Sequence, residues 1–340
     1  MLDIKGNINY PSYWKTNAAY ILPIHSMKKI YLLAVHKSPK QVERQINALS
    51  DEHSYFYIHV DLKSDINSFR NLENIKNVFL IKERVDCIWG DFSQVMATLS
   101  LIDNAIKNHR DGYCILMSGS DYPLKSKENI HAFLAENYQK IFIDSNDAYS
   151  TWPEFHKRIE YYRINISSKR EDALMLKPGI GVHYIRTLYH FLIGRLSIRN
   201  FYQITYKKRK LRLNLKFYGG SSWWAMNIPD LAAVNDYIKT NKKELFEFFQ
   251  YSSCSDEFFF HSIIMHVFHH EITSKFQGSL THVDWNRKNC ALPVTFSVDD
   301  FEELMILPSN KLYARKFDLE MDEEILNKID ECINQRAKAV

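Results

Sequence analysis

A regular alternation of strand-length and helix-length segments between residues 28 and 145 is the feature that most constrains the fold. Five short, nearly continuous apolar runs are typical of parallel strands covered on both faces: 29–36, 55–61, 77–82, 113–121 and 139–144. The longest segment between them, 92–109, has the apolar spacing of an amphipathic helix, and Ser38 with Pro39 is typical of another helix start. This order predicts an α/β fold with a central, mostly parallel sheet and helices on both faces.

Polar side chains stand where several of these predicted strands end. His36 follows the first strand, Asp61 the second, and the polar run 118–121 the fourth. Open α/β sheets bind ligands outside the carboxyl ends of their strands, so a nucleotide pocket is expected within residues 28–145. The first strand is followed by no G-x-G-x-x-G, and the chain contains no Walker A lysine loop, which argues against dinucleotide and P-loop binding.

Composition limits the classes of function. The 340 residues carry a formal net charge of +4, too small to indicate nucleic-acid binding, and their 14% aromatic content suits stacking on nucleotides or sugars. Five scattered cysteines predict reduced thiols in a cytoplasmic protein. The N-terminus has no signal-peptide pattern, and no apolar run approaches the roughly 20 residues of a membrane helix. The basic run 206–216 is either a solvated loop or a contact with anionic lipid or an acidic glycan.

The predicted organisation is a single domain with two short ends. Residues 1–26 form an N-terminal extension and 331–340 a C-terminal tail, with one domain over 27–330. Within it, 27–145 is the nucleotide half and 146–330 the acceptor and catalytic half. Residues 146–218, rich in Tyr and Arg, are interpreted as helical insertions that frame a substrate.

The stretch "SCSDEFFFHSII" places Asp256 and Glu257 directly before three phenylalanines. One interpretation is a helix start, with Ser255 as the N-cap and two acids in the first turn. The other is a general base, because an acid beside apolar walls can have its pKa raised.

Six blocks, in this order, resemble the core-2/I-branching β-1,6-N-acetylglucosaminyltransferase family, which includes the peptide O-xylosyltransferases. The resemblance covers about residues 28–330 and rests on "VHKSPKQVERQINAL", "FYIHVD", "WGDFSQVMA", "SGSDYPLKS", "SDEFFFHSII" and "ARKFD". It implies a GT-A-type fold, a UDP-sugar donor and inverting transfer without the metal-binding D-x-D of other GT-A enzymes. The sequence agrees, since it contains no Asp-x-Asp.

Without a divalent cation, Arg and Lys must compensate the charge of the leaving diphosphate. The resemblance assigns this role to Lys316, with Arg315 beside it, while Arg287 or Lys288 are candidates for a second cation. It also implies that Glu257 is the catalytic base, with Asp256 in support. The remaining donor-side candidates are Val35, His36, Asp61, Arg84, Trp89 and Asp121, and the acceptor-side candidates are Trp223, Trp224, Arg158, Glu160 and Arg163.

The predicted function is metal-independent, inverting transfer of a sugar, GlcNAc first and xylose second, from a UDP-sugar to a glycan hydroxyl. No cofactor and no nucleic-acid partner is expected. We expect a bacterial enzyme of surface polysaccharide or lipid-linked oligosaccharide synthesis, cytoplasmic or peripheral on the inner membrane face. The alternatives are a catalytically silent nucleotide-sugar or glycan-binding protein and a metal-dependent transferase. His266 and His270 have a zinc-ligand spacing, but no obvious third ligand follows.

Overall fold

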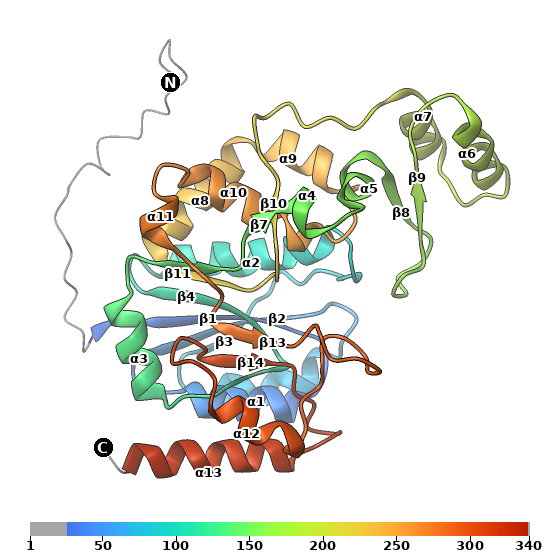
Figure 1. Cartoon of the computed structure of the whole chain (residues 1–340). Coiled ribbons are helices and arrows are strands. Elements are labelled where there is room, and N and C mark those ends of the chain that lie inside the picture. Colours follow the sequence, from blue (N-terminus) through green and yellow to red (C-terminus); the bar gives the residue numbers. More distant parts are fainter. Residues whose placement is uncertain (1–25, 339–340) are drawn as a thin grey trace.

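A seven-stranded sheet forms the centre of the molecule in the computed structural model, which describes residues 26–338 (Figure 1). The predicted N-terminal extension therefore lies outside the described residues, apart from Ser26. The strand order is β12-β6-β11-β4-β1-β2-β3, and only β11 runs antiparallel to its neighbours. The strands are β1 (Lys29–Val35), β2 (Ser54–Val60), β3 (Val78–Leu80), β4 (Tyr113–Ser118), β6 (Ile141–Ile143), β11 (Trp224–Asn227) and β12 (Phe276–Gln277). The predicted α/β class is confirmed, and each of the five predicted strands is present.

Helices cover both faces of this sheet (Figure 1). One apolar cluster joins the sheet to α2 (Ser93–Asn108), α8 (Ile228–Thr240), α9 (Lys242–Phe249) and α10 (Phe259–Val267). The other joins it to α1 (Pro39–Leu49), the 3₁₀ helix η3 (Ile66–Asn74) and α3 (Lys127–Glu136). The near-continuous apolar composition of β1 and β4 is explained by this arrangement, since both of their faces are buried.

A smaller sheet, β13-β14-β5, lies at the carboxyl ends of the central strands. Its members are β5 (Asp121–Pro123), β13 (Thr281–Val283) and β14 (Tyr313–Arg315). A third apolar cluster joins it to α12 (Phe301–Met305) and α13 (Glu324–Lys338). The 3₁₀ helix η5 (Val298–Asp300) directly precedes α12. The predicted boundary at residue 330 is wrong, because it falls inside α13, and Cys332 and Ile333 pack against this cluster.

The region predicted as helical insertions contains four helices and, unpredicted, a two-stranded hairpin. The helices are α4 (Ala148–Thr151), α5 (Phe155–Glu160), α6 (Val182–Leu192) and α7 (Ile198–Tyr206), and the hairpin is β8 (Tyr162–Asn165) with β9 (Ala173–Leu176). A short pair, β7 (Asn146–Asp147) with β10 (Tyr218–Gly219), joins the two ends of the region. Figure 1 shows α6 and α7 projecting from the body beyond the hairpin. We call residues 177–212 the arm.

Two predicted helix starts differ from the structure. Pro39 opens α1 as predicted, but Ser38 has a φ of 52° and its side chain makes no cap hydrogen bond. Ser255 caps no helix: it begins the 3₁₀ turn η4 (Ser255–Glu257), and α10 starts only at Phe259. The short helix α11 (Ile272–Lys275) follows α10 as a separate element. Asp256 and Glu257 therefore sit in a tight turn and not in the first turn of the helix. Within the described residues, no helix combines the length and the apolar character that crossing a membrane requires.

Candidate active site

Glu257 lies at the end of the η4 turn, directly in front of the buried ring of Phe258. Its Oε2 is 2.5 Å from Nη1 of Arg158, which comes from α5. The guanidinium of Arg158 also lies 4.2 Å from the centre of the Trp152 ring. Arg158, predicted as an acceptor contact, thus holds the Glu257 carboxylate in place between an aromatic face and the η4 turn.

Asp256 has a different environment although it is the next residue. Ser222 donates its hydroxyl hydrogen to Oδ2 of Asp256 at 2.9 Å. Burial, together with the negative charge of Glu257, raises the pKa of Asp256 to about 6. The turn therefore presents two adjacent carboxylates, of which one is paired with a guanidinium and the other accepts a neutral hydrogen bond.

Two glycine-containing segments hold the η4 turn. The Gly220 amide donates to the Glu257 carbonyl at 3.0 Å, and the Cys254 amide donates to the Gly90 carbonyl at 2.8 Å. A Cβ at Gly219 would overlap the Trp152 ring, and one at Gly220 would overlap the Asp144 carbonyl. Close packing around the carboxylates therefore explains why "YGGSSWW" carries two glycines at this bend.

Cations gather around Lys316, directly after the end of β14. The Lys316 side chain is half-buried, and no carboxylate among the described residues lies within ion-pair distance of its ammonium. Burial and the positive charges of Arg315, Lys37 and Arg170 lower the pKa of Lys316. Of these, Lys37 is paired with Asp318 at 2.7 Å. An anion bound here would relieve the repulsion, which is the electrostatic requirement of a diphosphate site.

Arg315 connects this cluster to the carboxylates. Its Nη1 lies 3.0 Å from Oδ1 of the fully buried Asp121 and also hydrogen-bonds the Ser118 hydroxyl. The guanidinium stacks on Trp223, 4.5 Å from the ring centre. Since Trp223 directly follows Ser222, the partner of Asp256, the cations and the carboxylates belong to one continuous site. Asp121, predicted to hold the donor, serves here as the counter-ion that positions Arg315.

The other donor-side candidates surround the ends of β1 and β2. The Asp61 amide donates to the Val35 carbonyl at 2.8 Å, which ties the two strand ends together. The His36 side chain lies beside them at the surface, where partial desolvation by its neighbours and the positive charge of Lys37 lower its pKa. The Arg84 guanidinium donates to the main-chain carbonyls of Val60, Asp61 and Ser64. It therefore shapes the loop after β2.

Trp89 contacts one member of the cation cluster, Arg170, which the sequence analysis did not identify. The Trp89 ring is 45% exposed, and the Arg170 guanidinium, from the β8–β9 connection, lies 4.4 Å from its centre. Arg163, predicted as an acceptor contact, is buried and donates to the Trp89 carbonyl at 3.0 Å. Lys37 was also missed, although its position directly after His36 at a strand end was a usable signal.

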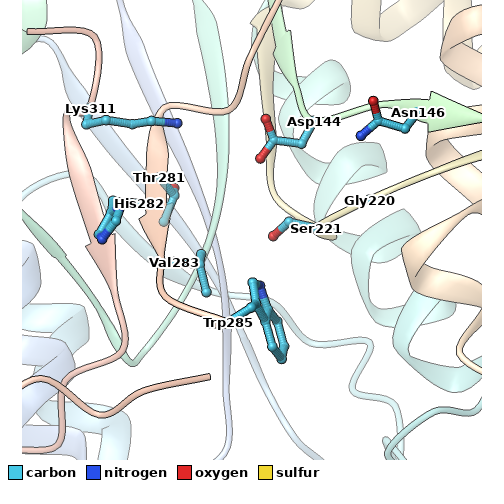
Figure 2. Close-up of a pocket in the computed structure, with 9 residues that line it drawn as sticks. All are labelled: Asp144, Asn146, Gly220, Ser221, Thr281, His282, Val283, Trp285 and Lys311. Carbon is cyan, nitrogen blue, oxygen red and sulfur yellow. The ribbon is translucent and has the colours of Figure 1, made fainter. Parts of the chain in front are cut away.

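A pocket of about 300 Å³ opens beside the Gly-Gly bend (Figure 2). Figure 2 shows the Asp144 carboxylate and Ser221 across the pocket from Lys311, with the Trp285 ring below Ser221. The Trp285 side chain is 51% exposed. Sequence reasoning considered "DSND" only as a metal motif and "DWNRKN" only for its cations, so it missed this pocket. The remaining lining residues are Asn146, Gly220, Thr281, His282 and Val283.

Three further predicted site residues lie elsewhere. Trp224, in β11, is a core residue with 2% exposure and packs near Phe260 of α10, so it cannot stack on a sugar. Glu160 is exposed at the end of α5 and forms no ion pair with any described residue. Arg287 is held by Asp300 at 2.8 Å and by Asp284 at 3.3 Å, which leaves its charge compensated.

The zinc interpretation of His266 and His270 finds no further ligand. Between residues 26 and 338, no three His, Cys, Asp or Glu side chains converge so as to hold a metal ion.

A GT-A-like α/β sheet with carboxylates and a cation cluster at one site is the plan of a glycosyltransferase. The family model described as "Branch: Core-2/I-Branching enzyme" matches residues 30–306, so the chain belongs to the Core-2/I-Branching enzyme family.

Xylosyltransferases are among the curated relatives of this chain. A "Xylosyltransferase" of Ciona intestinalis is 24% identical over 328 residues, which is 90% of this chain and 34% of the relative. "Xylosyltransferase 1" of Homo sapiens is 22% identical over 358 residues, 96% of this chain and 32% of the relative. "Xylosyltransferase oxt" of Drosophila pseudoobscura pseudoobscura is 24% identical over 323 residues, 88% and 33%. The chain spans about a third of the length of these relatives.

Proposed function

We propose that this glycosyltransferase moves a sugar from a UDP-sugar to a hydroxyl of a glycan acceptor, with inversion and without a divalent cation. Inversion requires one in-line displacement, in which the acceptor oxygen attacks the anomeric carbon while UDP leaves from the opposite face. Glu257 takes the acceptor proton, and Lys316 and Arg315 compensate the charge that develops on the diphosphate.

The observation that carries the proposal is the continuous path from the cations to the carboxylates. Arg315 stacks on Trp223, and the neighbouring Ser222 hydrogen-bonds Asp256, which is followed by Glu257. A donor whose diphosphate lies on Lys316 would thus have its sugar near the Gly-Gly bend. The Gly220 amide of that bend donates to the Glu257 carbonyl, so the catalytic carboxylate belongs to the turn next to the bend.

We assign the acceptor to the pocket in Figure 2. Gly220 lines the pocket and its amide donates to the main-chain carbonyl of Glu257, so a sugar bound in the pocket would lie close to the turn that carries the carboxylate. The exposed Trp285 indole offers an apolar face for a sugar ring, while Asp144 and Lys311 offer hydrogen-bonding groups for hydroxyls. Trp223 is already covered by Arg315 and is better suited to hold that cation than to stack on the acceptor.

We propose UDP-GlcNAc as the first candidate donor, because the branching enzymes that the sequence resembles are N-acetylglucosaminyltransferases. UDP-xylose is the second candidate, and the names of the curated relatives favour it. The five cysteines are all free in the structure, which supports a reducing compartment. We place the reaction in bacterial surface polysaccharide or lipid-linked oligosaccharide synthesis at the inner membrane face.

A screen of UDP-sugars with and without EDTA tests the proposal. A donor at about 100 times its Kd should stabilise the native state by about 2.7 kcal/mol, seen as a raised melting temperature. With a glycan acceptor present, transfer should proceed equally in EDTA and in Mn²⁺. A loss of more than about tenfold on chelation would refute metal independence. Binding of the donor without any product, across a panel of acceptors, would favour the catalytically silent alternative.

A further inference from the structure

The arm exposes an unusual share of the large apolar side chains of the protein. Eighteen large hydrophobic side chains are exposed among the described residues, and nine of them fall within residues 180–206. Scattered exposed apolar residues are normal on a protein surface, but a concentration of this kind marks an interaction surface.

The helix α6 is oriented with its apolar side outward. The exposed residues recur at the spacing of one helical face, with exposures of 70% to 86% for three of them: Val182, Ile185 and Leu192. Tyr189, on the same face, is 57% exposed. The buried positions of α6 are instead Thr187 and His190. A helix that only covered a protein core would show the reverse arrangement.

The neighbouring helix α7 also exposes an apolar face. Ile198, Tyr202 and Tyr206 are spaced four residues apart and are all exposed by 55% or more. The rings of Tyr202 and Tyr206 lie 5.2 Å apart, and the Lys207 ammonium lies 5.9 Å from the centre of the Tyr202 ring. Tyrosines beside a lysine at the edge of an apolar face are typical of residues placed at a membrane–water interface.

The charge of the arm has one sign. From residue 173 to residue 229 the sequence contains no Asp and no Glu, yet nine Lys and Arg lie between Lys177 and Arg212. None of these nine forms an ion pair with a carboxylate of the described residues, although Arg209 is turned inward onto main-chain carbonyls. A pocket of about 320 Å³ at the base of α6 is lined by Lys177 and Arg186, together with His183 and with Lys157, which is paired with Glu154.

We propose that the arm docks the protein on an anionic phospholipid bilayer. The outward face of α6 and α7 enters the interface between head groups and acyl chains, and the cationic pocket receives a lipid phosphate. This inference uses no residue of the transfer reaction and does not depend on the donor or the acceptor. The sequence analysis named only the basic run 206–216 as a candidate lipid contact, whereas this proposal assigns most of the membrane contact to α6 and α7.

Charge argues against a second copy of this chain as the occupant of the arm. An isologous dimer through this surface would bring together two sets of the eight cations that remain without Arg209. An anionic bilayer supplies both the apolar interior and the opposite charge.

Vesicle flotation of the full chain tests the proposal. The wild-type protein should float with phosphatidylcholine vesicles that contain about 30 mol% phosphatidylglycerol, and bind at least about tenfold less to phosphatidylcholine alone. The double variant Ile185→Asp, Leu192→Asp should lose at least about tenfold in partitioning to the anionic vesicles. Lys177→Ala and Arg186→Ala should each weaken binding about fivefold, equivalent to about 1 kcal/mol, and less at high salt.

The matched control is the double variant Ile306→Asp, Met321→Asp, which replaces side chains of 81% and 71% exposure outside the arm. It should float like the wild type. UDP binding is measured in each variant, because an unchanged affinity for UDP shows that the fold and the donor site are intact when vesicle binding is lost. Absence of flotation by the wild type, or equal losses in the arm and control variants, would overturn the proposal. A dimer that becomes a monomer on the arm substitutions, with no vesicle binding, would overturn it in favour of a second copy.

Discussion

Replacing Glu257 by Gln separates the two interpretations of the Asp256–Glu257 pair, a structural role in the chain turn and a general base. The amide keeps the size of the side chain and can still accept or donate a hydrogen bond, but it cannot take a proton from the acceptor. If Glu257 is the general base, transfer should fall by about 10²–10⁴, which is the usual contribution of a positioned base.

The structure sets the cost of the same change in stability. Glu257→Gln removes the charge opposite Arg158, in a pair whose side chains are 28% and 23% exposed. A partly exposed ion pair of this kind contributes about 1 kcal/mol or less. Such a loss corresponds to a fall in melting temperature of about 2 °C for a chain of this size. The expected loss of activity, about 3–5 kcal/mol of barrier, is therefore much larger than the loss of stability.

The assay combines product formation with UDP affinity at fixed pH. Turnover with saturating donor should fall in Glu257→Gln, while UDP affinity should stay within about twofold, because the diphosphate site that we propose is at Lys316 and not at the η4 turn. Asp256→Asn is the matched control, since Asp256 occupies the same turn and can keep its hydrogen bond from Ser222 as an amide.

Two results would refute this reasoning. If Asp256→Asn abolished transfer and Glu257→Gln left it within a few-fold, Asp256 would be the base, consistent with its raised pKa of about 6. Small and equal effects at both positions would show that the pair serves only to form the turn before α10.

Three other changes have defined outcomes. Lys316→Ala should weaken UDP binding about 10–100-fold in calorimetry and slow transfer, since a charge-assisted contact contributes about 1.5–3 kcal/mol, whereas Lys243→Ala, on the exposed surface of α9, should do neither. Trp285→Ala should raise the KM for a glycan acceptor about tenfold without changing UDP affinity, and an equal effect on both would remove the acceptor from this pocket. Because the pKa of Asp256 is raised in the fold from 3.8 to about 6, the folded state binds the proton more tightly and stability falls as pH rises through this range. Asp256→Asn should thus be more stable than the wild type in urea at pH 7, by on the order of 2 kcal/mol, and indistinguishable near pH 4.

Local patterns in the sequence determined the elements and the fold class. The apolar runs at 29–36 and 113–121 became the buried strands β1 and β4, with ends that differ by at most three residues from the prediction. This success has a physical reason: a strand covered on both faces needs an apolar side chain at nearly every position, and that requirement is visible in a single window of the chain. The "SDEFFF" block was likewise recognisable, because polar and apolar residues change abruptly there.

Only the tertiary structure decided which side chains meet. Arg158 and Glu257 are 99 positions apart, and Lys37, Arg170 and Lys316 come from three separate segments. Trp224 and Arg84 are chemically suitable for a binding site, yet one is buried in β11 and the other is bound to main-chain carbonyls. The outward apolar face of α6 could not be predicted either, because periodicity shows that a helix has an apolar side but not whether that side faces the core or the solvent. Contacts between distant segments depend on how the elements pack, and no local period encodes that.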